Sequence, residues 1–152
     1  MKKVLSVLLS SAIIVSNVSA LPLNTNAAWK GQYEFEKGII INSGKNGAEV
    51  MSVNGASGGK AVDIKDGGNT VTLTVNAENS GAHRLSIRYN QPYDEDRKYQ
   101  NVIVNGKSAG ELFFDYTGDD FGVISINADL KSGSNEIAVE ASWGWTNLDC
   151  LL

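Results

Sequence analysis

Short alternating runs of apolar and polar residues dominate the chain after residue 28. Apolar residues recur at every second position in 70–75 and in 84–89, with Thr, Ser or Arg between them. A period of two is typical of a half-buried strand, whereas an amphipathic helix needs apolar positions three and four residues apart. No apolar period of helical length follows in the rest of the chain. The pattern therefore predicts β-strands rather than helices.

Turn residues separate these runs at regular intervals. Asn105 and Gly106 close the run 101–105 and favour a tight hairpin into 111–114, because both tolerate a positive φ. Further apolar runs lie at 123–126 and 136–139. The separators are rich in Gly, Ser and Asn: 42–47, 54–59, 66–69, 79–81 and 131–135. Short strands at this spacing predict a single all-β domain, an antiparallel β-sandwich of jelly-roll type.

The first 28 residues are expected to be a secretory signal peptide. Two lysines precede an apolar run at 4–15, and small residues follow at the positions that a signal peptidase reads. Cleavage after Ala20 is an alternative to cleavage after Ala28. The apolar run is shorter than the roughly 20 residues that span a bilayer. We therefore expect 29–152 to be the mature domain, secreted and extracellular, with no membrane partner.

Composition and charge argue against a nucleic-acid partner and against a disulfide bond. The formal charge is −4 and Lys and Arg are not clustered, which argues against nucleic acid as a partner, because phosphate backbones are bound by basic patches. The single cysteine, Cys150, excludes an intramolecular disulfide and is interpreted as a small buried hydrophobic residue. We expect a monomer.

Catalysis has little support in the residue types. His83 is the only histidine and is in phase with the apolar positions of 84–89, which predicts an inward-facing structural role. A zinc site of His and Cys ligands therefore cannot be assembled. The carboxylates that a glycosidase would need lie in segments interpreted as solvated loops: Asp94, Glu95, Asp96, Asp115, Asp119 and Asp120. We expect no catalytic residues, with a small glycosidase as the alternative.

Binding has clearer marks in the sequence. Trp143 and Trp145 lie two residues apart in a loop-like segment, where at least one indole is easily presented to solvent. An exposed indole can stack on the C–H face of a sugar ring, whose hydroxyls need polar partners. The residues that could supply those partners, or a further ring, are Asn147, Arg88, Asn90, Gln91 and Tyr93. The alternative is that both tryptophans belong to the core.

Acidic residues near both ends of the mature chain raise the question of a metal site. In an extended strand Glu34 and Glu36 would point to the same side, about 7 Å apart along the backbone. Carboxylate oxygens are the ligands that calcium prefers, and Asp149 could be a third. From spacing alone, two solvent-facing glutamates on an edge strand are the favoured interpretation.

Six segments follow one another in an order that resembles one known family: 33–36, 60–64, 85–89, 102–106, 130–137 and 147–149. From about residue 33 to residue 151, the chain resembles carbohydrate-binding modules of family 35, which are akin to family 6. The resemblance implies a jelly-roll β-sandwich that binds plant polysaccharide. It also implies a module without catalytic activity, appended to a secreted glycoside hydrolase or esterase.

The resemblance assigns roles to individual residues. It places a structural calcium ion on Glu34, Glu36 and Asp149, and it places the sugar site in the segments 88–93 and 143–147. Family members that bind uronic acids hold a second calcium ion in that site, and the acidic run 94–96 makes one conceivable here. Cys150 stands where the family usually has an aromatic residue.

The pattern is also similar to the N-terminal module of secreted clostridial-type β-mannanases of glycoside hydrolase family 26. β-Mannan, as galactomannan or glucomannan, is therefore the expected ligand. The expected partner is an appended mannan endo-1,4-β-mannosidase domain, of whose chain this sequence would be a fragment. The alternatives are uronic-acid or galactose-containing chain ends bound through calcium, and an adhesion module that binds another protein.

Overall fold

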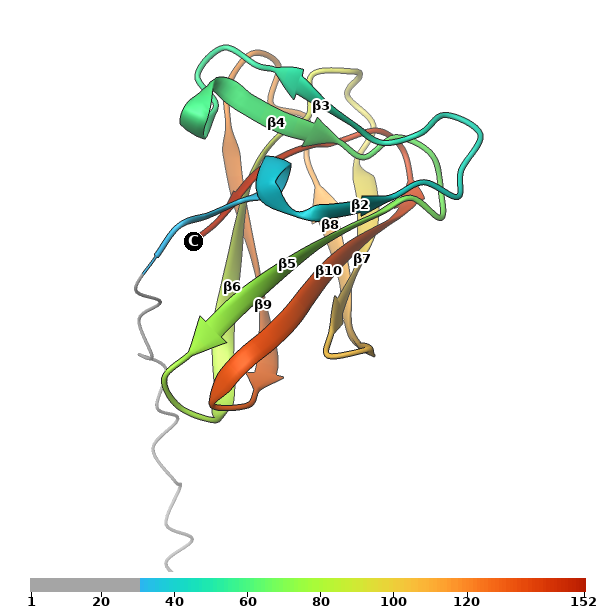
Figure 1. Ribbon diagram of the computed structural model, residues 1–152. Coiled ribbons are helices and arrows are strands. Elements are labelled where there is room, and N and C mark those ends of the chain that lie inside the picture. The colour runs from blue at the N-terminus through green and yellow to red at the C-terminus, as the bar shows by residue number, and fades with distance from the viewer. Residues whose placement is uncertain (1–30) are drawn as a thin grey trace, which may run out of the picture.

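Two antiparallel β-sheets packed face to face make up residues 31–152, the part of the chain that the computed structural model describes (Figure 1). In chain order the strands are β1 (Tyr33–Glu34), β2 (Ile39–Ile41), β3 (Glu49–Ser52), β4 (Lys60–Asp63), β5 (Thr70–Ala77), β6 (Gly81–Asn90), β7 (Lys98–Val104), β8 (Lys107–Phe114), β9 (Gly122–Leu130), β10 (Gly133–Trp143) and β11 (Asn147–Leu151). Two short 3-10 turns, η1 (Phe35–Lys37) and η2 (Ser57–Gly59), complete the described part. The predicted all-β sandwich is confirmed, and the predicted signal peptide lies outside the described residues.

The strand order gathers five loops at one end of the sandwich. The first sheet has the order β3-β4-β11-β6-β9, with β1 alongside β11, and the second has the order β2-β5-β10-β7-β8. In the first sheet the end of β4 and the end of β6 both pair with Asn147 at the start of β11. The register of both sheets places the β2–β3, β4–β5, β6–β7, β8–β9 and β10–β11 connections at this end. We call it the loop end.

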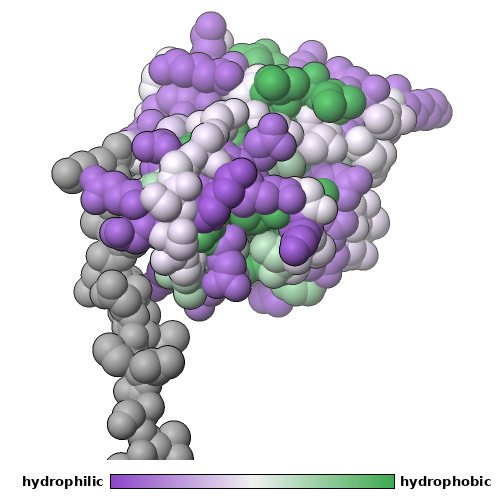
Figure 2. Space-filling model, turned by 60° about the horizontal axis from the view of Figure 1, so that its bottom comes forward, coloured by the Kyte–Doolittle hydropathy of each residue, from purple (hydrophilic) through white to green (hydrophobic). Residues whose placement is uncertain are grey.

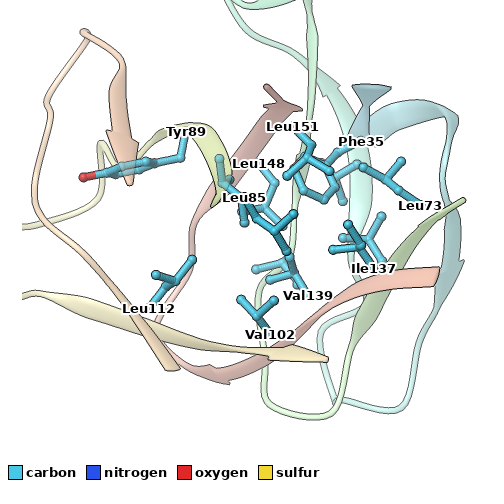
Figure 3. Close-up of a cluster of buried hydrophobic side chains, with 14 of the residues drawn as sticks. Phe35, Leu73, Leu85, Tyr89, Val102, Leu112, Ile137, Val139, Leu148 and Leu151 are labelled. Carbon is cyan, nitrogen blue, oxygen red and sulfur yellow. The ribbon is translucent and has the colours of Figure 1, made fainter. Parts of the chain in front are cut away.

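The core lies between the two sheets and is filled by alternate residues of both (Figure 3). Leu85 and Leu148 enter it from the first sheet, and Val102, Ile137 and Val139 enter it from the second, all without solvent exposure. Burying one such side chain contributes about 1.5–3 kcal/mol. The alternation predicted for 70–75 and 84–89 is confirmed by the burial pattern of β5 and β6.

Two local predictions are also confirmed. Asn105 and Gly106 have φ of 51° and 78° and join β7 to β8 in a two-residue turn, with Val104 paired to Lys107. Positive φ at both turn residues is the geometry that matches the twist of a hairpin. His83 is buried, and its Nε2 lies 2.8 Å from the carbonyl oxygen of Asn79, in agreement with a structural role.

The predicted extended strand through Glu34 and Glu36 is wrong. β1 ends at Glu34, and Phe35–Lys37 form the turn η1. The turn carries the chain from the first sheet, where β1 pairs with β11, to the second sheet, where β2 pairs with β5. The ring of Phe35 is fully buried at this crossing, next to Leu73 and Leu151 in the core (Figure 3). The two glutamates are therefore related by a turn and not by a pleat.

Hydrophilic side chains cover much of the face seen in Figure 2, with smaller hydrophobic areas between them. Among residues 31–152, no helix is long and apolar enough to cross a membrane.

Candidate functional site

A β-bulge in β11 decides which side chains lie on the outer face of the first sheet. Leu148 pairs with Tyr89 of β6, but Cys150 pairs with Arg88, so Asp149 is an extra residue in β11. Strict alternation would send Cys150 into the core, whereas the bulge turns it outward beside Asp149 and returns Leu151 to the core (Figure 3). Both outward-facing side chains are nevertheless buried, and the segment around η2 contacts Asp149 through the backbone N–H of Ser57.

Two carboxylates, those of Glu34 and Asp149, meet beneath η2, and a third, that of Glu36, lies close by on η1. Asp149 is fully buried; its Oδ1 accepts a hydrogen bond of 2.8 Å from the backbone N–H of Ser57, and its Oδ2 is paired with Arg88. Glu34 Oε1 accepts a hydrogen bond of 2.7 Å from the hydroxyl of Ser57. Glu36 lies on η1 with its Oε1 close to Gly58 of η2. We call Glu34, Glu36 and Asp149 the acidic cluster.

The acidic cluster has the donor set of a calcium site. The Oε2 atoms of Glu34 and Glu36 are both buried and have no hydrogen-bond partner within residues 31–152. A buried carboxylate oxygen without a partner is costly, and a bound cation would remove that cost. The hard oxygen donors converging here are those that calcium takes at 2.3–2.6 Å. The residues therefore fit the ion that the resemblance implies.

Besides the acidic cluster, a row of polar side chains crosses the outer face of the first sheet at the loop end. Glu49, Asp63, Asn147 and Asn90 are directly opposite one another on β3, β4, β11 and β6. Asn147 donates to Asn90 Oδ1 at 2.9 Å and accepts from the hydroxyl of Tyr93 at 3.2 Å. We call these four residues and Tyr93 the polar row.

Asp63, which the sequence reading missed, is the distinctive member of the polar row. Its side chain is only 3% exposed, and its Oδ1 has no hydrogen-bond partner among the described residues. Burial raises the pKa of Asp63 above its usual value. The pKa of Tyr93 is also raised, mainly by burial and, to a smaller extent, by the nearby charge of Asp63. A carboxylate inside the otherwise apolar segment 61–64 was the signal that could have identified it.

An open depression adjoins the polar row. It has a volume of about 470 Å³, and Asn90 and Asn147 form part of its wall together with Met51, Asn54, Pro92 and Asp119. Asn54 is the exposed amide on this wall, whereas Asn90 and Asn147 are only 3% and 2% exposed. The side-chain N–H groups of Asn90 donate to the carbonyl oxygens of Gly118 and Asp120 in the β8–β9 loop.

Trp145 stands beside the polar row. It is 37% exposed, and its ring meets the ring of Tyr93 edge to face with the centroids 5.7 Å apart. Its indole N–H donates to Asp66 Oδ1 at 3.1 Å. The backbone N–H of Asn46, followed by this indole N–H, lowers the pKa of Asp66, so the acceptor that orients the indole stays ionised. Trp145 is thus an oriented and accessible ring next to hydrogen-bonding groups.

Trp143 belongs to a different aromatic cluster. Its ring stacks on Tyr99 with the centroids 5.4 Å apart, and Tyr99 in turn contacts Phe113 on β8. The ammonium group of Lys98 lies 4.7 Å from the Trp143 centroid. Trp143 is 44% exposed, so exposure alone does not distinguish the two tryptophans. Their neighbours do, because only Trp145 contacts the polar row.

Gly144 separates the two aromatic clusters and permits their arrangement. Its φ is +77°, and a Cβ atom there would collide with the side chain of Lys98. We expect Gly144→Ala to lower the melting temperature by several degrees, since the left-handed backbone costs about 1–2 kcal/mol and Lys98 must also move. Gly133→Ala is the control, because its φ is +88° and its Cβ would meet nothing within 4 Å. Equal losses for the two variants in a thermal melt would contradict the collision.

The remaining predicted ligand residues lie elsewhere. Gln91 is fully buried, and its side chain donates to the carbonyl groups of Asp94 and Asp96, so it holds the β6–β7 loop in place. Arg88 lies next to the acidic cluster, where it pairs with Asp149 and donates to the carbonyl oxygen of Gly55 at 3.1 Å. The structure therefore brings together Trp145, Tyr93, Asn147 and Asn90, and it separates Trp143, Gln91 and Arg88 from them.

The loop carboxylates do not have the environment of a general acid. Asp94 pairs with Lys98, and this contact lowers the pKa of Asp94. Asp115 pairs with Arg97 at 2.7 Å, and both side chains are well exposed. A glycosidase acid needs a raised pKa in a partly buried site. Glu95, Asp96, Asp119 and Asp120 are exposed as well, so none of the six loop carboxylates offers this.

Comparison with known proteins assigns the family. The sequence profile of carbohydrate binding module (family 35) matches residues 31–152. The chain belongs to this family. Family 35 modules are non-catalytic, and one of the relatives below carries such a module together with a GH26 mannanase.

Relatives of this family 35 module are found by sequence and by structure. Mannan endo-1,4-beta-mannosidase A of Piromyces sp. is 32% identical over 129 residues, which cover 81% of this chain and 20% of that enzyme. The chain thus spans about a fifth of the length of this curated relative. A family 35 module from Clostridium thermocellum has a TM-score of 0.71 at 26% identity, covering 80% of this chain and 94% of that one. The GH26-CBM35 beta-(1,4)-mannanase of Podospora anserina has a TM-score of 0.66 at 27% identity, covering 80% and 26%.

Proposed function

We propose that this family 35 module binds β-mannan and thereby holds an attached glycoside hydrolase on that polysaccharide. The observation that carries the proposal is the position of Trp145, an oriented and exposed indole, against Tyr93 of the polar row, of which two other members border the open depression at the loop end. Stacking of a sugar ring on an indole combined with hydrogen bonds to its hydroxyls is the chemistry of sugar recognition.

Each part of this surface has a role in the proposed complex. The indole of Trp145 supports one sugar ring, with Tyr93 fixing the edge of the platform. The exposed amide of Asn54 on the wall of the depression bonds hydroxyl groups, and the nearly buried Asn90 and Asn147 line the same depression. With one or two stacked rings, each contributing about 1 kcal/mol beyond its buried area, the dissociation constant should be micromolar to millimolar.

The choice of mannan is supported by the relatives. A curated relative that matches 81% of the chain is a mannan endo-1,4-beta-mannosidase, and a solved structural relative is a beta-(1,4)-mannanase that contains a family 35 module. We propose that the partner of this chain is a catalytic domain of the same class. We further propose that 1–28 direct secretion and that the mature module is a monomer.

We also propose that the acidic cluster binds one calcium ion as a structural element. Glu34, Glu36 and Asp149 would be its carboxylate ligands. Support comes from the two buried glutamate oxygens that have no hydrogen-bond partner. The ion would connect η1, the η2 segment and β11. Arg88, which pairs with Asp149, also donates to the carbonyl oxygen of Gly55 in the segment that precedes η2, so the ion would lie close to that segment too.

Affinity electrophoresis tests the ligand. We expect gels that contain galactomannan or glucomannan to retard the module, and gels that contain xylan or polygalacturonate to leave its migration unchanged. Each gel is run with and without calcium. Calcium-dependent retardation by polygalacturonate alone would replace mannan by uronic-acid chains, and no retardation by any of the four polymers would contradict the proposed function.

A further inference from the structure

The thiol of Cys150 faces the acidic cluster and not the hydrophobic core. Because of the bulge in β11, Cys150 lies directly opposite Glu34 on β1 and Arg88 on β6. Its Sγ is 3.8 Å from Asp149 Oδ2, and the thiol sulfur and one carboxylate oxygen each from Glu34 and Asp149 all lie within 4.8 Å of one another. Leu148 and Leu151 belong to the core cluster, whereas Cys150 does not. A sulfur atom has therefore been placed among oxygen ligands.

Sulfur changes which metal ions such a group can hold. Calcium takes oxygen ligands only, whereas zinc and related ions accept thiolate together with carboxylate. Around a tetrahedral zinc ion, with bonds of roughly 2.0–2.3 Å, neighbouring ligand atoms are about 3.5 Å apart. The observed separations, all within 4.8 Å, reach this value by closing by about 1.3 Å or less, which side-chain rotation can supply.

We propose that the Cys150 thiol, together with Glu34 and Asp149, gives this chain a mixed sulfur and oxygen site that binds a thiophilic divalent ion of the zinc class in competition with calcium. Coordination replaces the S–H bond by an S–metal bond, and the proton goes to solvent. No electron is transferred. The inference rests on the proposed metal site and goes beyond it, since it concerns the selectivity of that site.

The contacts of Arg88 allow a metal ion to replace it at Asp149. Its guanidinium forms an ion pair with Asp149 Oδ2, and a metal ion bound at that oxygen would displace the guanidinium. The guanidinium carbon also lies 3.9 Å from the ring centroid of Phe121, and Nη2 bonds the carbonyl oxygen of Gly55. With these two contacts, the guanidinium of Arg88 would still have partners after its ion pair with Asp149 is lost.

Cobalt titration of the full chain tests the proposal. Co²⁺ is a spectroscopic substitute for zinc, and a cobalt–thiolate bond absorbs in the near ultraviolet. Because the chain has a single cysteine, any such band reports Cys150. We expect the metal-free protein to gain the band on adding Co²⁺ and to lose it on adding equimolar Zn²⁺. The absence of a band at saturating Co²⁺ would overturn the inference.

Two variants make the result specific. Cys150→Ser keeps an oxygen of similar size, and we expect it to lose the band and to bind zinc about tenfold more weakly or worse, while its stabilisation by calcium is retained. Glu34→Gln keeps the thiol but loses one carboxylate, and should weaken cobalt binding even if the serine variant folds poorly. A band that persists in Cys150→Ser would place the metal elsewhere and contradict the proposal. Stabilisation by calcium without a cobalt band would overturn the selectivity alone, whereas no response to either ion would overturn the proposed calcium site as well.

Discussion

Replacing Trp145 by alanine should remove retardation by mannan while the domain stays folded. A ring at the centre of a small binding surface typically contributes 2 kcal/mol or more, so we expect the affinity to fall by about 30-fold or more. The indole is more than a third exposed, and its contacts with Tyr93 and Asp66 lie outside the core, so the melting temperature should change by only a few degrees. Affinity electrophoresis in galactomannan and a thermal melt measure the two effects.

Trp143→Ala is the matched control for this prediction. It removes the same side chain from an equally exposed position, but from the cluster with Tyr99 and not from the polar row. We expect it to retain most of the retardation. Loss of binding in Trp143→Ala with full binding in Trp145→Ala would move the sugar site to the outer face of the second sheet. Full binding by both single variants would contradict a stacked tryptophan altogether.

The two tryptophans also show what the sequence could and could not predict. Their type and their place in a loop are visible in the chain, and this was sufficient to expect an exposed indole. Their separation into different clusters follows from the positive φ of Gly144 and from packing against Lys98, which residue order does not reveal. Gln91 and Arg88 have side chains that could bond sugar hydroxyls. In the folded chain, however, Gln91 bonds loop carbonyl groups and Arg88 pairs with Asp149.

The fold was more accessible than the site because it depends on local patterns. Alternation in β5 and β6 and the Asn105–Gly106 turn are local, and each predicted its element correctly. The strand prediction at Glu34 and Glu36 failed because the chain passes from the first sheet to the second between β1 and β2, and the sheet that each strand joins is set by long-range pairing. The bulge at Asp149 depends on the pairing of β11 with β6, so no reading of 147–151 alone could place Cys150.

Removing calcium should produce the largest change in stability. An ion that binds only the folded chain stabilises it by about 4.1 kcal/mol when its concentration is 1,000 times its dissociation constant. For a domain of this size the melting temperature should then fall on the order of 10 °C when a chelator is added, and it should recover when calcium is restored. Differential scanning calorimetry with and without chelator measures this. An unchanged melting curve would contradict calcium binding by the acidic cluster.

Variants of the two glutamates make the calcium prediction sharper, because the sign of their effect depends on the ion. Glu36→Gln removes a buried, unpartnered carboxylate oxygen, so without metal the variant should melt at the same temperature as the native chain or above it. With calcium it should melt below the native chain, because a ligand has been lost. Glu49→Gln, whose side chain is 63% exposed and bonds Lys65, should show neither effect. A Glu36→Gln variant that is destabilised equally with and without calcium would mean that the carboxylate contributes through protein contacts and not through an ion.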